Sequence, residues 1–174
     1  MQPTRQVLLE PDPPLVALTA TARGMIESTF TRAAQRAFTE LMVAVADAGL
    51  LHQVRSRIGL FPDEPVGPND ARCRYLAGVL FGHDLASRRG PCLQPPLALG
   101  GSLAWMTIAP GRHAVFLHAG PWNELHLTWA AIHRDWLPRS GERLRQDPPF
   151  ELSLNSSDDV PPEALRTEIW IPLA

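Results

Sequence analysis

The chain has 174 residues and a formal net charge of −2, with 45% hydrophobic and 20% charged residues. Such a chain can bury a sizeable core, whereas its scattered arginines and near-neutral charge argue against a nucleic-acid-binding or polybasic membrane surface. Because it has neither the basic and apolar start of a signal peptide nor ~18 consecutive apolar residues, we expect a globular cytoplasmic protein that binds neither DNA nor membranes.

The first predicted elements are a strand and a helix. Residues 15–23, LVALTATAR, are rich in β-branched and small apolar residues, which favours a strand. In residues 28–51 the apolar positions recur at helical spacing. This pattern predicts a helix that Ser28 or Thr29 caps and Gly49 ends.

The remaining elements repeat this order. Strands are predicted in residues 56–63 and 72–82, and residues 101–120 read as a hairpin that turns at Pro110-Gly111. Pro121 then opens a tryptophan-bearing helix, which two more strands follow in residues 150–157 and 166–174. The chain therefore presents two successive β-α-β-β units.

A constant offset supports an internal duplication. Shifting the sequence by 94 residues pairs identical residues, namely Val66 with Val160, Pro68 with Pro162, and Arg72 with Arg166. Each unit would expose an apolar face that its twin can cover. We expect one α+β domain over residues 1–174, made of pseudo-twofold halves at about 13–95 and 96–174.

Several motifs carry a family resemblance. The second half contains an arginine-led strand ending in His-x-Gly-Pro-aromatic, a helix closing in Trp-Leu-Pro-x-Ser-Gly, and Phe-Glu-x-x-x-Asn before Pro-Pro-Glu. The first half contributes FTELMVAVADAGLL, RIGLFPDEPV and CRYLAGVLF. As a set, from Leu15 to Ala174, the sequence resembles the GyrI-like small-molecule-binding family, which also supplies effector-binding domains of AraC-type and multidrug-responsive regulators.

The resemblance implies an SHS2-like architecture, an antiparallel sheet with two main helices and a ligand cleft between the halves. Two positions depart from the family pattern: Tyr75-Leu76 stands where Tyr-Asp is frequent, and Trp122 replaces a tyrosine after Gly-Pro. The wider indole suggests a reshaped pocket. Because no helix-turn-helix precedes the first strand, we expect a stand-alone binder without direct DNA contact.

The tryptophans of the second helix form a stripe. Trp122, Leu125, Trp129, Ile132 and Trp136 follow the spacing of one helix side. For Leu125 and Ile132 we expect ordinary core packing. The indole N–H groups need hydrogen-bond partners, which favours a cleft rim. The stripe is therefore either core or the wall of a binding site, with Trp129 the leading wall candidate.

Glu151 lies in a strand whose polar and apolar residues alternate over residues 150–155. If Leu152 and Leu154 face the helices, Glu151 faces away from them, toward solvent or into a cleft. An exposed strand carboxylate is the ordinary interpretation, but the resemblance places Glu151 on the family's pocket glutamate. A carboxylate walled by aromatic rings would favour a lipophilic cation as ligand.

Other residues are candidates for the cleft wall. The repeat aligns Arg57 with Glu151, so the two halves would differ chemically at the cleft, although a surface arginine is the simpler interpretation. Trp105, Met106, Phe61 and Tyr75 are equally compatible with a core role. The candidate ligand-binding residues are Glu151, Trp129, Trp105, Tyr75, Phe61, His118 and Trp122.

Histidines and cysteines give no metal or cofactor prediction. His126 and His133 are two turns apart, about 10 Å along a helix, which is too far for them to share one ion. His118 could hydrogen-bond a ligand at a strand end or stabilise the following turn. Cys73 and Cys92 lack metal or redox spacing. We therefore expect no metal and no cofactor.

Three functions remain open. The leading hypothesis is a binder of hydrophobic, cationic or amphipathic small molecules, for drug sensing, sequestration or protection. The second, suggested by the resemblance, is a hydrolase of cyclopropane-bearing genotoxic natural products, with Glu151 as base and Tyr75, His118 or a tryptophan orienting the substrate. The third is a gyrase-binding protein, ranked last because the sequence has no acidic surface of the kind that mimics DNA.

Overall fold

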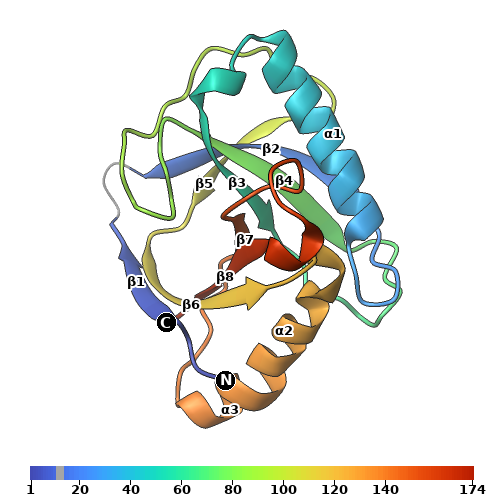
Figure 1. The fold of residues 1–174 in the computed structure, drawn as a ribbon, viewed down its shortest axis with the longest axis vertical. Coiled ribbons are helices and arrows are strands. Elements are labelled where there is room, and N and C mark those ends of the chain that lie inside the picture. The colour runs from blue at the N-terminus through green and yellow to red at the C-terminus, as the bar shows by residue number, and fades with distance from the viewer. Residues whose placement is uncertain (11–13) are drawn as a thin grey trace.

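The computed structural model describes residues 1–10 and 14–174. Within these residues, eight strands form one curled antiparallel sheet with the order β1-β6-β8-β7-β3-β4-β2-β5 (Figure 1). The strands are β1 (Arg5–Leu9), β2 (Leu15–Arg23), β3 (Val54–Leu60), β4 (Arg74–Phe81), β5 (Ala104–Ile108), β6 (Gly111–Ala119), β7 (Phe150–Ser153) and β8 (Arg166–Pro172). The expected α+β class is confirmed. Residue 13, the expected start of the first half, lies outside the described residues.

Two main helical segments lie on one face of this sheet (Figure 1). The first is α1 (Thr31–Asp47). The second is continuous but changes its winding, from a 3-10 turn (Trp122–Glu124) through α2 (Leu125–Ala131) and a π turn (Ile132–Trp136) to α3 (Leu137–Ser140). Short 3-10 turns also span Leu51–Gln53 and Pro162–Ala164. Within the described ranges, no helix combines the length and apolar character needed to cross a membrane.

The strand order is the same when the two halves are exchanged. One half contributes β2, α1, β3 and β4, the other β6, α2, β7 and β8, and the central strands β3 and β7 pair with each other. The offset of 94 residues carries Ile58 onto Leu152, and Leu152 is also the partner of Ile58 across these strands. The pseudo-twofold axis therefore passes through this pair.

The predicted hairpin over residues 101–120 is wrong. β5 pairs with β2, whereas β6 pairs with β1 and β8, so the two strands lie in different halves of the sheet. Ala109 and Pro110 connect the two strands, and Gly111, the first residue of β6, has a positive φ of 118° that glycine tolerates. This connection leads the chain to the other half of the sheet, where β6 has its partners.

The start of α1 also differs from the prediction. Phe30 occupies the N-cap position, and no side chain caps the helix. The hydroxyl of Thr29 instead donates to the carbonyl of Ile26, within the turn that precedes the helix. The predicted end is confirmed, because Gly49 has a φ of 71° just after the last helical residues.

The helix-bearing face of the sheet carries two separate cores. Under α1, the alanine and leucine side chains of the helix pack on β2 and β4. Under the second helix, Ile132 and Trp136 pack with Phe116 and Ile169 of β6 and β8. Because each helix covers its own half, the central strands β3 and β7 remain without a helix over them.

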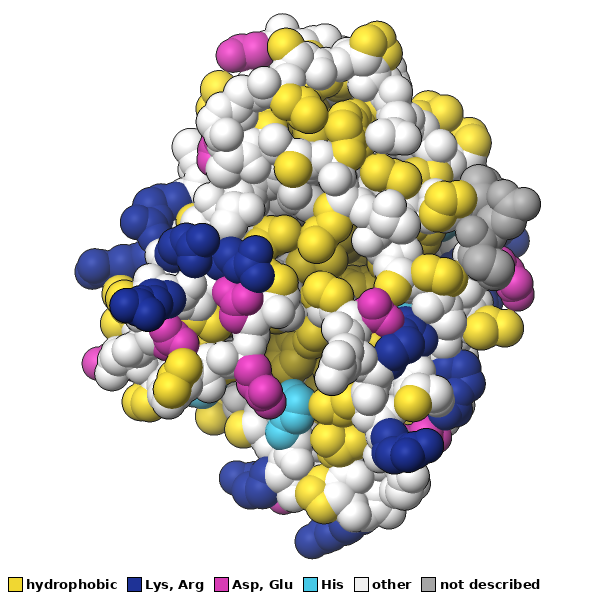
Figure 2. All heavy atoms as spheres, turned by 180° about the vertical axis from the view of Figure 1, so that it is seen from behind, with side chains coloured by type: hydrophobic (Ala, Val, Ile, Leu, Met, Phe, Trp, Pro, Cys, Tyr) yellow, Lys and Arg dark blue, Asp and Glu magenta, His cyan; other side chains and the backbone are white. Residues whose placement is uncertain are grey.

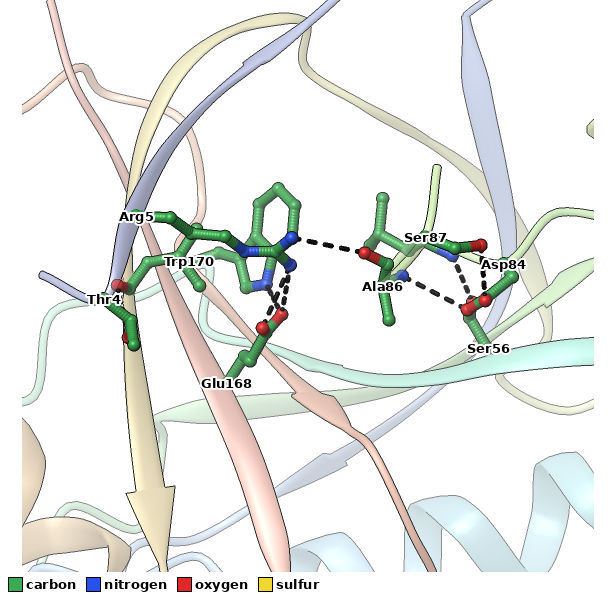
Figure 3. Close-up of polar contacts among 10 residues, drawn as sticks. Thr4, Arg5, Ser56, Asp84, Ala86, Ser87, Glu168 and Trp170 are labelled. Carbon is green, nitrogen blue, oxygen red and sulfur yellow. Dashed lines mark hydrogen bonds and ion pairs between the residues drawn. The ribbon is translucent and has the colours of Figure 1, made fainter. Parts of the chain in front are cut away.

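A third core fills the opposite, curled face of the sheet. On this face, side-chain contacts link β1 to β8. The guanidinium of Arg5 donates to both oxygens of Glu168, at 3.0 and 2.8 Å, and to the carbonyl of Ala86 (Figure 3). The indole of Trp170 also donates to Glu168, at 3.0 Å. These contacts join the N-terminal strand, the loop after β4 and the C-terminal strand. Nearby, the hydroxyl of Ser56 accepts from the Leu85 N–H.

Candidate functional site

A cleft of about 1590 Å³ lies over β3 and β7, between α1 and the second helix. Loops after β3 and around β7 complete its walls. The space-filling view shows a face hollowed at its middle, with apolar side chains in the hollow and acidic and histidine side chains at its edge (Figure 2). The cleft is larger than most sites for one drug-sized molecule, which occupy ~300–1,000 Å³. It therefore has room for a bulky ligand.

Strand alternation gives the cleft a polar floor. Antiparallel pairing places Gly59 opposite Glu151 and Arg57 opposite Ser153, and these side-chain positions face the helices. The condition under which Glu151 would face away from the helices is not met, because Leu152 lies in the core on the opposite face. Glu151 therefore points toward the helices, into the gap between them.

Glu151 forms the polar centre of the cleft. Its Oε1 accepts a hydrogen bond of 2.6 Å from the indole N–H of Trp129. Burial raises the pKa of Glu151 to about 7, and the hydrogen bond from Trp129 only partly offsets this rise. A carboxyl group in this environment can change its charge near neutral pH, and an adjacent cation would favour the ionised form.

The tryptophan stripe divides into three different environments. Trp129 lies in the cleft, edge-on to Phe61 at 5.0 Å between ring centroids and stacked on His133 at 6.0 Å. Trp122 is 43% exposed and lines the rim. Trp136 is 5% exposed and packs in the core against Phe116. As expected, Leu125 and Ile132 are buried, so the stripe is partly wall and partly core.

The first half supplies an aromatic wall around Tyr75. Its ring centroid lies 5.5 Å from Phe61, 5.8 Å from Phe30 and 6.2 Å from Phe38. Burial, and secondarily the charge of Glu151, raises the pKa of the Tyr75 hydroxyl. A Cβ atom at Gly59 would overlap this phenol group. Gly59 therefore leaves the space that Tyr75 occupies beside Glu151.

Phe30 and Phe38 are cleft residues that the sequence reasoning did not single out. The buried face of α1 is the row Ala33, Ala37, Leu41 and Val45. The neighbouring row, one position away, lines the cleft and contains Phe30, Ala34, Phe38 and Met42. Two adjacent apolar rows on one helix were the available signal, since one row is enough to cover a sheet.

Three candidates from the sequence lie outside the cleft lining. Trp105 packs in the core under α1, with its ring 6.0 Å from Phe81. Met106 packs against the core of the opposite face. His118 is buried, with Nδ1 2.8 Å from the Thr128 hydroxyl and Nε2 3.2 Å from the Pro121 carbonyl, so its ring holds the turn into the helix.

The lining of the cleft carries more acidic than basic groups. Two of its carboxylates are neutralised, Asp63 by Arg74 and Asp147 by Arg145. The other charged lining residues form no ion pair among the described residues: Glu64, Glu151, Asp158 and Arg57. Within the same part of the chain, no cluster of three possible metal ligands occurs. The field in the cleft therefore favours cationic ligands.

Comparison with known proteins gives a family match over most of the chain. A family model described as the GyrI-like small molecule binding domain matches residues 16–174. The probable transcriptional regulator YgiV of Escherichia coli strain K12 is 38% identical over 65 residues. That segment is 37% of this chain and 40% of YgiV, so the match spans less than half of this curated relative.

Solved structures share the fold over nearly the whole chain. A hydrolase from Listeria innocua has a TM-score of 0.55 at 14% identity, covering 99% of this chain and 92% of that one. The protein SAV2435, bound to tetraphenylphosphonium, has a TM-score of 0.54 at 15% identity, covering 100% of this chain and 94% of that one. At such low identity these similarities concern the fold alone.

Proposed function

This chain belongs to the GyrI-like small-molecule-binding domain family, and on that premise we propose that its cleft binds a hydrophobic cation or amphipathic compound against Glu151. The biological role would be drug sensing, sequestration or protection. A structural neighbour with tetraphenylphosphonium bound supports this ligand class. A curated relative named a probable transcriptional regulator is consistent with a role in sensing.

The observation that carries the proposal is a half-buried carboxylate on the cleft floor that aromatic rings enclose. Glu151 has the indole N–H of Trp129 as its hydrogen-bond donor, and Tyr75, Phe61 and Trp129 surround the space beside it. No arginine or lysine among the described residues forms an ion pair with Glu151. A lipophilic cation would supply the missing charge and stack on the rings.

The pKa of Glu151 favours hydrolysis as a second candidate function. A carboxyl group with a pKa of about 7 can act as a general base at neutral pH, and it could activate water against a strained electrophile. A structural neighbour is named a hydrolase, which is consistent with this alternative. No observation on the described residues favours a gyrase-binding role, so we do not propose it.

Titration of intrinsic tryptophan fluorescence tests the binding proposal. Tetraphenylphosphonium should quench the fluorescence saturably, and Glu151→Gln should weaken its affinity about tenfold or more. Neutral triphenylphosphine oxide should bind both proteins with similar affinity. Glu64→Gln, which removes a carboxylate from the cleft lining, is the matched control and should lower cation affinity much less, because solvent screens an exposed charge.

Two other results would count against binding through Glu151. Equal affinities of wild type and Glu151→Gln for the cation would exclude an electrostatic role of Glu151. Consumption of a cyclopropane-bearing alkylating compound by wild type, lost in Glu151→Gln while binding is retained, would favour the hydrolase.

A further inference from the structure

A second polar row crosses the floor of the cleft beside Glu151. Strand register places Arg57 of β3 opposite Ser153 of β7, and Ser153 opposite Thr167 of β8. All three residues line the cleft. The row is therefore part of the same floor as Glu151, one step further along the strands.

The polar atoms of this row lack partners. The Oγ1 of Thr167 is buried in a residue that is 1% exposed, and it makes no hydrogen bond. Among the described residues, the Ser153 hydroxyl and the Arg57 guanidinium also form no side-chain hydrogen bond or ion pair. Leaving a buried hydroxyl unsatisfied costs about 1–3 kcal/mol, so the unpartnered Thr167 hydroxyl is an unusual feature, whereas solvent reaches the half-buried Ser153 and the exposed Arg57.

The neighbouring histidine, His118, forms no hydrogen bond with the side chains of this row. His118 is opposite Thr167 on β6, but both of its ring nitrogens lie within hydrogen-bonding distance of other groups, the Thr128 hydroxyl and the Pro121 carbonyl. The Thr167 hydroxyl therefore has no hydrogen-bond partner among the described residues. Together with Ser153 and Arg57, it offers two hydroxyl donors and one cation.

The row lies at a defined spacing from the carboxylate. Ser153 and Glu151 are two residues apart on β7 with side chains on one face, which corresponds to about 7 Å. Register keeps Arg57 opposite Ser153 rather than opposite Glu151. The floor thus presents a carboxylate in one row and a guanidinium with two hydroxyls in the next.

We propose that Arg57, Ser153 and Thr167 form an anion subsite that binds a carboxylate on the same ligand whose cationic group Glu151 binds. This inference rests on the proposed function, and it narrows the ligand class to hydrophobic zwitterions. A guanidinium and hydroxyl donors are the groups that bind a carboxylate by charge-assisted hydrogen bonds. The two charged groups of the ligand would align along the strands and fix its orientation in the cleft.

A matched pair of ligands tests the subsite. (4-Carboxybutyl)triphenylphosphonium and pentyltriphenylphosphonium share one cation, and only the first has a carboxylate at the end of its four-methylene arm. At about pH 8, where Glu151 is ionised, wild type should bind the carboxylate compound at least ~5-fold more tightly. The readout is the ratio of the two dissociation constants, from tryptophan fluorescence or calorimetry.

Substitutions of Arg57 and Thr167 test whether this row causes the preference for the carboxylate compound. Arg57→Gln should bring the ratio to about one while leaving pentyltriphenylphosphonium affinity within about twofold. Arg88→Gln removes another exposed arginine, one that lies outside the cleft lining, and should keep the wild-type ratio. Thr167→Val should lower the ratio without lowering the melting temperature, because it removes an unpartnered hydroxyl.

The outcomes separate this inference from the function on which it rests. Equal binding of both compounds by wild type would overturn the anion subsite and leave the cation site intact. A carboxylate preference that persists in both Arg57→Gln and Thr167→Val would also overturn it. Failure of both compounds to bind would instead refute the proposed function, and the subsite with it.

Discussion

The protonation of one residue, Glu151, couples the cleft to the stability of the fold. Its pKa is about 7 in the folded protein, against 4.5 for an unperturbed glutamate. Between these values the folded state binds the additional proton. The free energy of unfolding therefore falls as pH rises from about 4.5 to about 7 and stays low above that range.

Glu151→Gln should remove this pH-dependent cost. Because Gln is neutral and can still accept the Trp129 hydrogen bond, the variant should be more stable than wild type by about 2 kcal/mol at pH 8, allowing for partial solvation in the cleft. At pH 5 the two proteins should have nearly equal stability. Urea unfolding at both pH values measures the difference, and parallel pH profiles would contradict the raised pKa.

Gly59 is the second residue whose role follows from one contact. Gly59→Ala should place a methyl group against the Tyr75 phenol and destabilise the protein by about 1–3 kcal/mol through overpacking. The displaced ring should also weaken cation binding. Gly100→Ala, at an exposed glycine outside the cleft with open space around it, is the control and should change neither property. An unchanged melting temperature of Gly59→Ala would contradict this prediction, because it would show that the Tyr75 ring can move aside freely.

At the scale of elements, the second helix has two roles along its length. The π turn over Ile132–Trp136 shifts the phase of the side chains that follow it. Trp129 lies before this turn and faces the cleft, whereas Trp136 lies at its end and packs into the core. Tryptophans that are seven residues apart in one helix therefore contribute both to the wall of the cleft and to the core.

This division predicts different effects for two tryptophan substitutions. Trp136→Ala should cost about 3–5 kcal/mol of stability, because it leaves a large cavity next to Phe116. Trp122→Ala removes a partly exposed ring at the rim and should change stability by less than about 1 kcal/mol. Denaturant unfolding checks both values, and similar losses would mean that the stripe acts as one core face.

At the scale of the whole molecule, the halves exchange their outer strands. β1 precedes the first half but pairs with β6 of the second, and β5 precedes the second half but pairs with β2 of the first. This reciprocal arrangement supports our inference that the chain arose from a duplicated unit. It also joins the halves at both edges of the sheet, in addition to the central β3 and β7 pair.

The exchanged strand β1 should therefore stabilise the complete fold. Leu9→Ala should destabilise the protein by about 2–5 kcal/mol, because Leu9 is buried in the core that β1 shares with β8 and β2. Leu8→Ala, on the exposed side of the same strand, should cost less than about 0.5 kcal/mol. One cooperative transition in the Leu9 variant would show that both halves unfold together, whereas two transitions would contradict this coupling.

Periodicity and motifs in the amino-acid sequence predicted most local elements and the polar residue at the centre of the cleft. The strand in residues 15–23, the helix ending before Gly49 and the two-half element order all follow from periodicity, because backbone geometry sets the repeat of each element. The alternation of polar and apolar residues in β7 predicted that Glu151 and Leu152 lie on opposite faces of the sheet. The family motifs indicated that Glu151 is the one that points into a pocket.

Which elements contact each other depends on long-range packing, which local sequence patterns do not specify. The partners of β5 and β6, the row of α1 that faces the cleft, and the separation of Trp129 from Trp136 depend on contacts between residues far apart in the chain. The same is true of the row Arg57, Ser153 and Thr167, whose members come from three strands. Local periodicity predicts which side of a helix or strand is apolar. The helix or strand that this side packs against is determined by long-range packing alone.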